Sequence, residues 1–585
     1  MKLLFDTETN GLFPDVTRMW CLVIQDVDTG QMWDFTEDHL EDGVQLLNQA
    51  ELIAGHNILG FDIPALEKFT TFRLGSQKII DTLVLSRLFN PVREGGHSIE
   101  MWGNRFGLHK IDFKEFDRYS KEMLEYCKRD VAVNVKVYHE LRKESAGFDP
   151  RCIELETSVA SIMKDQEAHG FYFDNYKADM LLALMREKMK LAEKRVSEVF
   201  KPKVDERYIY RKETASGALS KLATWDRVGG PGVRLLDEEY EFFSKSSSMY
   251  TTRKTVVDFN IASRKQVGDY LIEFGWKPKQ YTENGRAVVN EKTLSEIEGI
   301  PEAELIKDYL MYQKRQAALE SWQKFLEKDN RVHGFVIPNG TITGRMTHRD
   351  PNMAQIPSVS SPYGKECREC WTVPTGYKLV GIDASGLELR MLAHYMNDEE
   401  YIDEIINGDI HTANQKLAGL ESRNQAKTFI YALLYGAGDE KLGTVAGGGR
   451  EVGSKLRGHF LHNLPSFNNL KNRVSLAAKR GFLKGLDGRK IFVRSEHAAL
   501  NTLLQGAGAI VMKKALVIFS EYIQDMDAHI VANVHDEWQV EAKEEIAEEV
   551  GRLGIAAIVQ AGWAYDLKCP LDGEFNVGNN WSETH

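Results

Sequence analysis

The sequence predicts a multidomain protein that joins an α/β domain to a larger α+β region. Its 585 residues are too many for a single hydrophobic core. Residues 1–145 alternate short apolar runs with segments of helical periodicity, as in a compact α/β domain. From about residue 333 onward, apolar strands flank a mainly helical block.

Composition narrows the class of protein only slightly. The hydrophobic fraction of 43% and the charged fraction of 27% are typical of a globular protein. No uninterrupted apolar run of about 18 residues occurs, so no membrane-spanning segment is expected. The 6 scattered cysteines suit a reducing cytosol, and Cys367-Arg-Glu-Cys370 has no second pair with which to bind zinc. A net charge of −12 neither supports nor excludes nucleic-acid binding, because such binding depends on local basic clusters.

The elements follow in chain order. Leu3–Phe5 and Met19–Gln25 are expected to be strands, and Glu122–Leu141 a helix. Residues 150–200 have the composition and spacing of two long amphipathic helices. Residues 201–260 are polar and irregular, include glycines 229, 230 and 232, and carry 11 Lys and Arg against 9 Asp and Glu.

The second half of the chain begins with helical patterns, at Ser263–Phe274 and Glu302–Lys328. Apolar strands are expected around Tyr377–Ile382 and His529–Val534. A helical block, roughly 403–481, lies between these two strands. A sheet interrupted by a helical insertion is therefore expected in this half.

A first group of acids lies in the N-terminal domain. Asp6-Thr7-Glu8 follows an apolar run, and strand alternation places both carboxylates on one face, about 7 Å apart. That spacing suits two carboxylates that share a pair of cations. Asp62 and Asp130 add two further acids, and Tyr126 lies one helical turn before Asp130. Any one of these acids alone could be a solvated surface residue.

Together these residues resemble the DnaQ-like (RNase H-like) 3′→5′ exonucleases of the tyrosine type, over about residues 1–145. The resemblance implies that Asp6, Glu8, Asp62 and Asp130 hold two divalent metal ions. It also implies that Tyr126 helps to orient the attacking water.

A second group of acids lies in the C-terminal half. Asp383 ends the apolar strand Leu379–Ile382, and Asp536 and Glu537 lie at the tight turn of an expected hairpin. A buried strand rarely ends in adjacent carboxylates unless a cation neutralises them. Asp383 and Asp536 could therefore clamp two Mg²⁺ ions against a nucleoside triphosphate.

The helical block contains a stripe with cationic and aromatic side chains. Arg423, Lys427, Tyr431 and Tyr435 recur every four residues, which on an α-helix drifts only about 40° per step. A basic end suits phosphates, and an aromatic end suits a stacked base. An aromatic stripe at this spacing is more often part of a core, but the two cations argue against a core here.

These segments resemble motifs A, B and C of family A DNA polymerases, the bacterial DNA polymerase I family, from about residue 333 onward. The amino-acid sequences of these segments are most similar to those of the replicative polymerases of short-tailed bacteriophages. The similarity extends to four further segments, Thr343–Arg345, Asn352–Pro357, Gly408–His411 and Asp487–Arg489 through Gln505.

The resemblance implies a 3′→5′ exonuclease domain followed by a right-hand polymerase domain. The expected limits are exonuclease 1–145, thumb 146–335 with an insertion at about 201–260, palm 336–403 and 491–585, and fingers 404–490.

The resemblance also implies roles for individual residues. Asp383, Asp536 and the Ala384 carbonyl would bind metal, with Glu537 in support. Two Mg²⁺ ions are expected at each site, with Mn²⁺ as a substitute. The triphosphate would contact His411, Arg423 and Lys427, the last also a candidate general acid. Tyr431 would stack on the incoming base and Glu388 would block a 2′-hydroxyl. The residues expected to contact DNA are Arg345, Tyr435, Gln505 and His535.

The expected partners are primer–template DNA, dNTPs, a phage helicase–primase and a single-strand binding protein, in the cytoplasm of an infected bacterial host and without a membrane. In known phage relatives a loop inserted in the thumb recruits host thioredoxin, a processivity factor. The sequence of residues 201–260 does not resemble that loop. A thioredoxin-binding site and a purely structural connection are therefore both left open as interpretations of this segment.

Three other functions are compatible with parts of this pattern. A single-subunit RNA polymerase uses a related carboxylate pair, but Glu388 and the exonuclease-like acids argue against it. A non-catalytic nucleic-acid-binding scaffold would be expected to lack some of these carboxylates. A stand-alone nuclease would leave most of the chain unexplained.

Overall fold

The computed structural model describes the whole chain except residues 14, 226 and 228–231. Most of the glycine-rich stretch 229–232 therefore lies outside the described residues. The chain forms two compact units, one of Met1–Asn175 with Trp322–His585 and the other of Tyr176–Ser321. The second unit falls within the residues predicted as the thumb, and the outer residues of that predicted thumb belong to the first unit. The domain limits themselves stay predictions.

A five-stranded mixed sheet forms the N-terminal part of the first unit, in the order β3-β2-β1-β4-β5. Strand β1 pairs antiparallel with β2 and parallel with β4. Leu3 and Phe5 pack into the core on one face of β1, whereas Leu4 packs into the core on the other face. The strands are β1 (Lys2–Thr9), β2 (Met19–Asp26), β3 (Met32–Thr36), β4 (Leu52–Gly55) and β5 (Lys78–Asp81).

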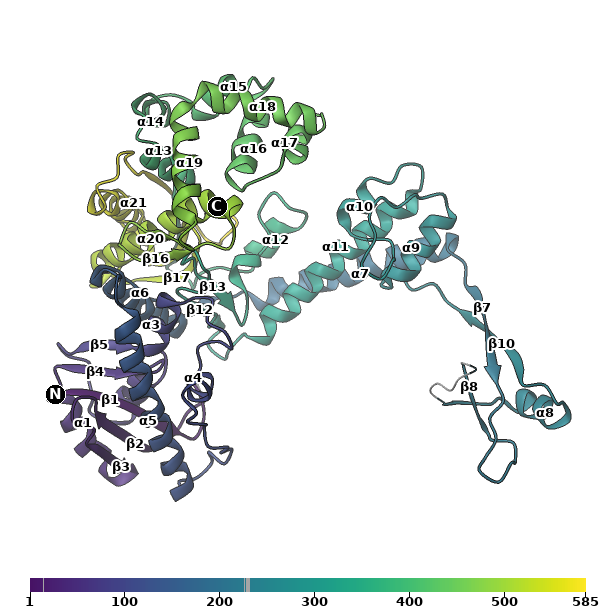
Figure 1. Ribbon diagram of the computed structural model, residues 1–585, viewed down its shortest axis with the longest axis horizontal. Helices are drawn as coiled ribbons and strands as arrows, with labels where there is room; N and C mark the ends of the chain where they lie inside the picture. Colours follow the sequence, from purple (N-terminus) through teal and green to yellow (C-terminus); the bar gives the residue numbers. More distant parts are fainter. Residues whose placement is uncertain (14, 226, 228–231) are drawn as a thin grey trace. The chain divides into compact units, whose positions relative to one another are not determined.

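Helices cover both faces of this sheet, which makes the region α/β as expected. α1 and α2 contribute to the core on the face of Leu3, and the long helix α5 packs on the face of Leu4. Figure 1 shows α5 lying along the sheet. The helices of this part are α1 (Leu40–Asn48), α2 (Asp62–Phe69), α3 (Thr82–Phe89), α4 (Ile99–Phe106) and α5 (Lys121–Glu144).

A four-stranded antiparallel sheet forms the centre of the C-terminal part, in the order β17-β18-β14-β19. A Cβ atom on Gly381 of β14 would come within 2.2 Å of the Thr584 carbonyl oxygen, so glycine is needed where the final segment crosses β14. The strands are β14 (Tyr377–Ala384), β17 (Ala528–Val534), β18 (Glu537–Lys543) and β19 (Gly573–Gly578).

Seven helices follow β14 in the described residues, as the predicted helical block requires. They share one large core with the sheet and with the two long helices that follow. The seven are α13 (Leu387–Met396), α14 (Glu399–Ile406), α15 (Ile410–Ala418), α16 (Arg423–Leu434), α17 (Asp439–Val445), α18 (Arg450–Asn463) and α19 (Pro465–Ala478). Short elements around this core are β6 (Phe171–Tyr172), β11 (Arg331–Val332), β12 (Phe335–Ile337), β13 (Thr347–Arg349), α12 (Gly364–Glu369), β15 (Phe482–Lys484) and β16 (Lys490–Phe492).

The long helices are α6 (Pro150–His169), α20 (Ala499–Ile523) and α21 (Ala547–Ala564). Among the described residues one helix, Glu496–Ile523 including its preceding turn, is long and apolar enough to cross a membrane. Within this helix, 78% of the apolar 18-residue stretch is buried inside the protein. Burial of that extent is typical of a core helix.

The second unit has a helical body with its own core. Ala192 and Val196 pack with Val267, Leu271 and residues of the last helix. The helices are α7 (Asn175–Val199), α9 (Arg264–Glu273), α10 (Glu291–Ser295) and α11 (Pro301–Lys324).

The insertion, predicted to be irregular, folds instead into a small domain, which we call the tip. In its described residues it has a four-stranded sheet in the order β10-β7-β8-β9 and one helix. Ile209, Ala223, Leu235 and Phe243 form its core. So few buried residues leave almost no periodic signal in the sequence, which explains the wrong prediction. Its elements are β7 (Lys203–Tyr210), β8 (Leu222–Thr224), β9 (Gly232–Arg234), α8 (Asp237–Lys245) and β10 (Tyr250–Val257).

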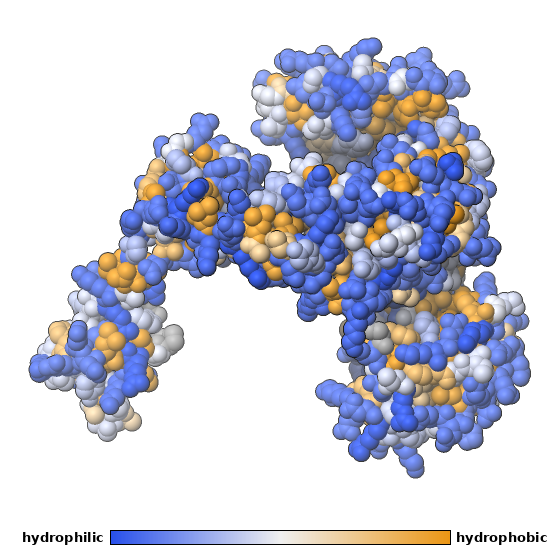
Figure 2. Space-filling view, turned by 180° about the vertical axis from the view of Figure 1, so that it is seen from behind, coloured by the Kyte–Doolittle hydropathy of each residue, from blue (hydrophilic) through white to orange (hydrophobic). Residues whose placement is uncertain are grey.

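The outer face of the tip sheet exposes hydrophobic side chains on either side of the Glu206–Lys254 ion pair. Tyr208 and Tyr250 lie across the β7–β10 pair, with ring centroids 5.3 Å apart. Val204 and Val256 are direct cross-strand partners on the same face, 62% and 68% exposed. Figure 2 shows hydrophobic patches on this small domain at the lower left.

Candidate active sites

The first group of acids gathers around β1. Asp6 and Glu8 lie on one face of the strand, as the alternation predicted, and this face looks toward α5. The sulfur of Cys127 on α5 lies 3.8 Å from Asp6 Oδ2. Ligand atoms of Asp6, Glu8 and Cys127 all lie within 4.8 Å of one another.

Asp62 joins the group from the other side of the strand. It is the first residue of α2, and its Oδ1 accepts hydrogen bonds from the Thr7 backbone nitrogen at 3.0 Å and from Thr7 Oγ1 at 2.6 Å. Thr7, between the two acids of β1, thus ties Asp62 to their strand. Burial raises the pKa of Asp62 to about 7.

Asp130 and Tyr126 come from α5, one turn apart as predicted, and both contact a lysine that the sequence did not indicate. Lys110 Nζ lies 2.7 Å from Asp130 Oδ2 and 4.6 Å from the centroid of the Tyr126 ring. The Tyr126 ring also packs against Phe113 and Phe116. Lys110 lies in the loop before α5, where neither periodicity nor spacing suggests a role.

The carboxylates of this group have too little positive charge around them. Burial, followed by the charges of Asp62 and Glu8, raises the pKa of Asp6 well above its ordinary value. Burial and neighbouring groups likewise raise the pKa of Glu8 to about 9. Glu8 is 8% exposed and makes no hydrogen bond or ion pair in the part of the chain that the structure describes. Asp130 Oδ1 is also buried without a hydrogen-bond partner. A set of buried carboxylates of this kind fits divalent cations.

The second group of acids meets at the centre of the four-stranded sheet. Asp383 on β14 lies directly opposite Glu537 on β18. The Ala384 backbone nitrogen donates to the Asp536 carbonyl oxygen at 3.1 Å, which brings the β17–β18 turn to the end of β14. That turn has only two residues, His535 and Asp536, between the paired Val534 and Glu537. His535 adopts a φ of 62°, which is unusual outside glycine.

Two of these three carboxylates are available for a cation. Burial and the charges of Asp536 and Glu537 raise the pKa of Asp383 to about 7, and burial also raises the pKa of Asp536. Neither side chain makes a hydrogen bond or ion pair with another described residue. The pair therefore fits metal ligation as the sequence predicted.

Glu537 differs, because the protein itself satisfies it. Trp581 Nε1 and Gln539 Nε2 each donate to its Oε1 at 2.6 Å, and His585 Nδ1 lies 2.8 Å from its Oε2. Burial alone would raise the pKa of Glu537, but His585 and these hydrogen bonds hold it below its ordinary value. A supporting role suits this residue better than direct ligation.

The stripe on α16 faces solvent, as its two cations suggested. Arg423, Lys427 and Tyr435 are exposed and Tyr431 is half-buried, whereas Phe429 and Ile430 form the core face. Arg423 Nε pairs with Asp409 Oδ2 at 2.6 Å, a contact that a phosphate could replace. The ring of His411 on α15 lies 6.4 Å from that of Tyr431. These residues therefore gather at one surface.

Glu388 on α13 connects this stripe to the second acid group. The Tyr435 hydroxyl donates to both Glu388 oxygens, at 2.9 and 3.0 Å, and Arg345 Nη2 donates to Oε1 at 3.0 Å. Tyr435 was predicted to contact DNA, and here it holds Glu388 in place.

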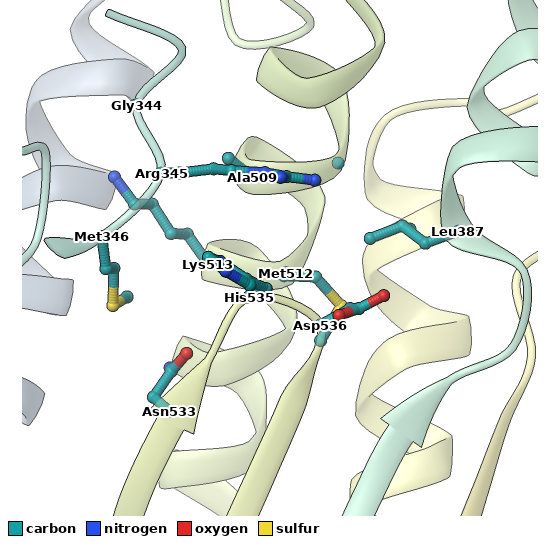
Figure 3. Close-up of a pocket in the computed structure, with 11 residues that line it drawn as sticks. Gly344, Arg345, Met346, Leu387, Ala509, Met512, Lys513, Asn533, His535 and Asp536 are labelled. Carbon is teal, nitrogen blue, oxygen red and sulfur yellow. The ribbon is translucent and has the colours of Figure 1, made fainter. Parts of the chain in front are cut away.

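The remaining predicted residues lie around α20. Figure 3 shows Arg345 reaching across α20 near Ala509, with His535 and Asp536 at the tip of the β17–β18 hairpin. Arg345, His535 and Asp536 line the same small pocket. Gln505 is half-buried on α20. The two acid groups themselves stay apart, each on its own sheet.

A buried ion network near this pocket was also missed by the sequence. Glu156 Oε1 on α6 lies 2.5 Å from both Lys513 Nζ on α20 and Arg489 Nη1, and Arg489 pairs with Asp487 at 2.6 Å. Burial alone would raise the pKa of Glu156, but the two cations hold it below its ordinary value. Asp487 and Arg489 belong to a segment that the sequence singled out, whereas Lys513 lies in an apolar helix and gave no signal.

Comparisons with known proteins indicate the family and the fold of the chain. The family model "DNA polymerase family A" matches residues 237–583. The DNA-directed DNA polymerases of Enterobacteria phage T3 and Escherichia phage T7 are each 34% identical to this chain, and each match covers 100% of both chains. Among solved structures, the POL domain of Pol1 from M. smegmatis, in complex with DNA primer-template and dNTP, has a TM-score of 0.76. That match has 17% identity and covers 100% of this chain and 95% of the other. At that identity the structural match supports the fold alone.

Proposed function

The chain belongs to DNA polymerase family A, and on that basis we propose that it is a phage-type, DNA-directed DNA polymerase that also edits with a 3′→5′ exonuclease. Synthesis from dNTPs is assigned to the group around Asp383 and Asp536. Editing is assigned to the group around Asp6, Glu8, Asp62 and Asp130. The cytoplasm of an infected bacterial host is the corresponding location.

The observation that carries the synthetic activity is the meeting of Asp383 with Asp536. These two carboxylates, with the Ala384 carbonyl, would hold two Mg²⁺ ions. At each acid group, bound ions of this kind would activate the attacking oxygen and stabilise charge on the leaving oxygen. Glu537, fixed by His585 and Trp581, would keep the hairpin in register beside Asp383.

Residues of α15 and α16 would bind and orient the nucleotide. His411, Arg423 and Lys427 would donate to the triphosphate along one surface, and Lys427 would give a proton to the leaving pyrophosphate. Tyr431 would stack on the base. Glu388, held by Tyr435 and Arg345, would occupy the space that a 2′-hydroxyl needs.

The editing site is supported by three buried acids, Glu8, Asp62 and Asp130, beside the half-buried Asp6. Asp6, Glu8, Asp62 and Asp130 would share two divalent ions, and the otherwise unpartnered Glu8 and Asp130 Oδ1 are the groups that require them most. Tyr126, fixed between Lys110 and Phe113, would orient the attacking water.

Primer–template DNA and dNTPs are the proposed substrates, with contacts from Arg345, Gln505 and His535. The exposed hydrophobic face of the tip is the proposed docking site for a processivity factor, with host thioredoxin as the candidate. A phage helicase–primase and a single-strand binding protein would act alongside.

Separating the two activities tests this proposal. Asp383→Asn should abolish primer extension with Mg²⁺ and dNTPs while digestion of single-stranded DNA persists. Asp6→Asn with Glu8→Gln should do the reverse. Glu549→Ala, which removes an exposed acid of α21, is the matched control and should change neither activity. Extension by Asp383→Asn at the wild-type rate would remove the proposed synthetic site, and preference for rNTPs would indicate an RNA polymerase.

A further inference from the structure

Two cysteine thiols lie beside the carboxylates proposed for editing. Cys127 Sγ is 3.8 Å from Asp6 Oδ2 and 3.6 Å from the Asp6 carbonyl oxygen. Cys21 on β2 is the cross-strand partner of Glu8, and its side chain is hydrogen-bonded to Cys127. Both cysteines are fully buried. Neither thiol has a role in the proposed hydrolysis.

Three potential ligand atoms lie close together between β1 and α5. Ligand atoms of Asp6, Glu8 and Cys127 lie within 4.8 Å of one another, on two elements that pack together. A tetrahedral zinc ion with bonds of about 2.0–2.3 Å holds its ligands about 3.3–3.8 Å apart, so these atoms would have to approach one another by at most about 1.5 Å. Small side-chain rotations would therefore complete a three-ligand site, with a fourth position left for water.

The charge around this point also favours a cation. Glu8, at 8% exposure, has no hydrogen bond or ion pair within the described part of the chain. Lys110, whose charge acts on both Asp6 and Glu8, is paired with Asp130 at 2.7 Å. A buried carboxylate without a partner is costly, and a metal ion is the usual remedy.

We propose that Asp6, Glu8 and Cys127 form a binding site for a thiophilic divalent cation, Zn²⁺ or its analogue Cd²⁺, which competes with Mg²⁺ at the editing site. The proposal rests on the editing function assigned to Asp6 and Glu8. A thiolate ligand discriminates strongly here, because Zn²⁺ and Cd²⁺ accept sulfur whereas Mg²⁺ prefers oxygen. Binding exchanges the Cys127 proton for the metal and releases that proton to solvent.

This site predicts a selective effect on the protein. With a thiophilic ion in place, Asp6 and Glu8 cannot serve Mg²⁺, so editing stops while synthesis at Asp383 and Asp536 continues. The competing reading is that Cys127 is only a small apolar residue, since it packs with Leu4 and Val131. The two readings differ in whether the sulfur ever bonds a metal.

Titration of the metal-free full-length protein with Cd²⁺ distinguishes these two interpretations of Cys127 without an activity measurement. The ultraviolet charge-transfer absorption of a cadmium–thiolate bond should rise to one equivalent in the wild type and in Cys569→Ser, the matched control for loss of a buried cysteine. The band should be lost in Cys127→Ser and weakened in Glu8→Gln, which keeps the sulfur. Primer extension by each variant confirms folding. Absence of the band, or a band that persists in Cys127→Ser, overturns the proposal.

An activity assay then examines the competition. Zn²⁺ should suppress Mg²⁺-dependent digestion by the wild type, and Cys127→Ser should need about tenfold more Zn²⁺ for the same effect. Equal sensitivity of both proteins would contradict competition through Cys127. A wild type that shows the cadmium band but digests no DNA under any metal would instead refute the editing function and leave the metal site standing.

Discussion

Lys110 Nζ lies 2.7 Å from Asp130 Oδ2, so a loop lysine neutralises one of the four acids of the first group. The same ammonium lies 4.6 Å from the centroid of the Tyr126 ring. One cation therefore positions both residues that α5 contributes to the proposed editing site. The other Asp130 oxygen stays unpaired, which leaves this carboxylate able to bind a cation on its second side.

Lys110→Met should slow digestion of single-stranded DNA about 10- to 100-fold, the usual cost of losing a residue that orients a metal ligand. Removal of a positive charge should also lower the Mg²⁺ concentration at half-maximal rate, because less repulsion opposes the metal. Single-turnover digestion across Mg²⁺ concentrations measures both effects. Lys110→Arg, which keeps the charge, should retain most of the rate, and primer extension should be normal in both. A variant that slows digestion but needs more Mg²⁺ would indicate a merely structural lysine.

Glu388→Ala should weaken the rejection of ribonucleotides by about 100-fold or more, because the carboxylate occupies the space proposed for a 2′-hydroxyl. Tyr435→Phe should have a smaller effect of a few-fold, since it removes the phenol that hydrogen-bonds Glu388 but leaves Arg345. The readout is the ratio of kcat/KM for a dNTP to that for the matching rNTP. Unchanged ratios in Glu388→Ala would place the sugar discrimination elsewhere.

Raised carboxyl pKa values imply that the metal-free protein loses stability as pH rises. Glu8 and Asp62, with pKa values of about 9 and 7, bind protons more tightly in the fold than in the unfolded chain. Their contribution to the free energy of unfolding therefore falls between about pH 4 and those values. In EDTA the first calorimetric melting transition should move to lower temperature from pH 5 to pH 9, and Mg²⁺ should reverse the shift.

Glu8→Gln is the matching variant for this experiment. It should melt with a shallower dependence on pH in EDTA and should gain less from Mg²⁺. If wild type and variant follow the same pH dependence, Glu8 is not the group that destabilises the metal-free fold.

Regular periodicity made parts of both sites predictable from sequence. Alternation in β1 placed Asp6 and Glu8 on one face, and the four-residue repeat of α16 placed Arg423 and Lys427 on its exposed side. Asp383 and Asp536 were found because acids at the ends of apolar strands conflict with burial unless they share a cation. The positions of these residues follow from local rules that do not depend on how the rest of the chain folds.

The missed features depend on how distant segments meet. Lys110 reaches Asp130 from a loop, and His585 reaches Glu537 only because Gly381 lets the final segment cross β14. Cys127 lies at an ordinary core position of α5, and its closeness to Asp6 follows from the packing of that helix. The tip was predicted to be irregular because its sheet depends on four core residues and exposes half of β7.

Residues 207–253 can be removed where the tip joins the body, because Glu206 and Lys254 are direct cross-strand neighbours in the β7–β10 pair. A short Gly/Ser turn between these two residues should preserve the pairing of the remaining residues of β7 and β10. Single-nucleotide insertion should stay normal, since none of the residues assigned to synthesis lies in the tip. On a long primed template with an excess of trap DNA, products made in one binding event should become several-fold shorter in host extract.

Point substitutions on the exposed face distinguish docking from a structural role of the tip. Tyr208→Ser and Val256→Ser remove exposed hydrophobic groups and leave the core of Ile209 and Phe243 intact, so the tip should stay folded. Both should shorten products in host extract, because hydrophobic side chains at the centre of an interface supply most of its binding energy. Thr252→Ser, on the same face, is the control and should not. Purified thioredoxin in place of extract identifies that partner if it restores long products. Product lengths that match the wild type in both hydrophobic variants, with extract present and absent, would leave the tip without a docking function.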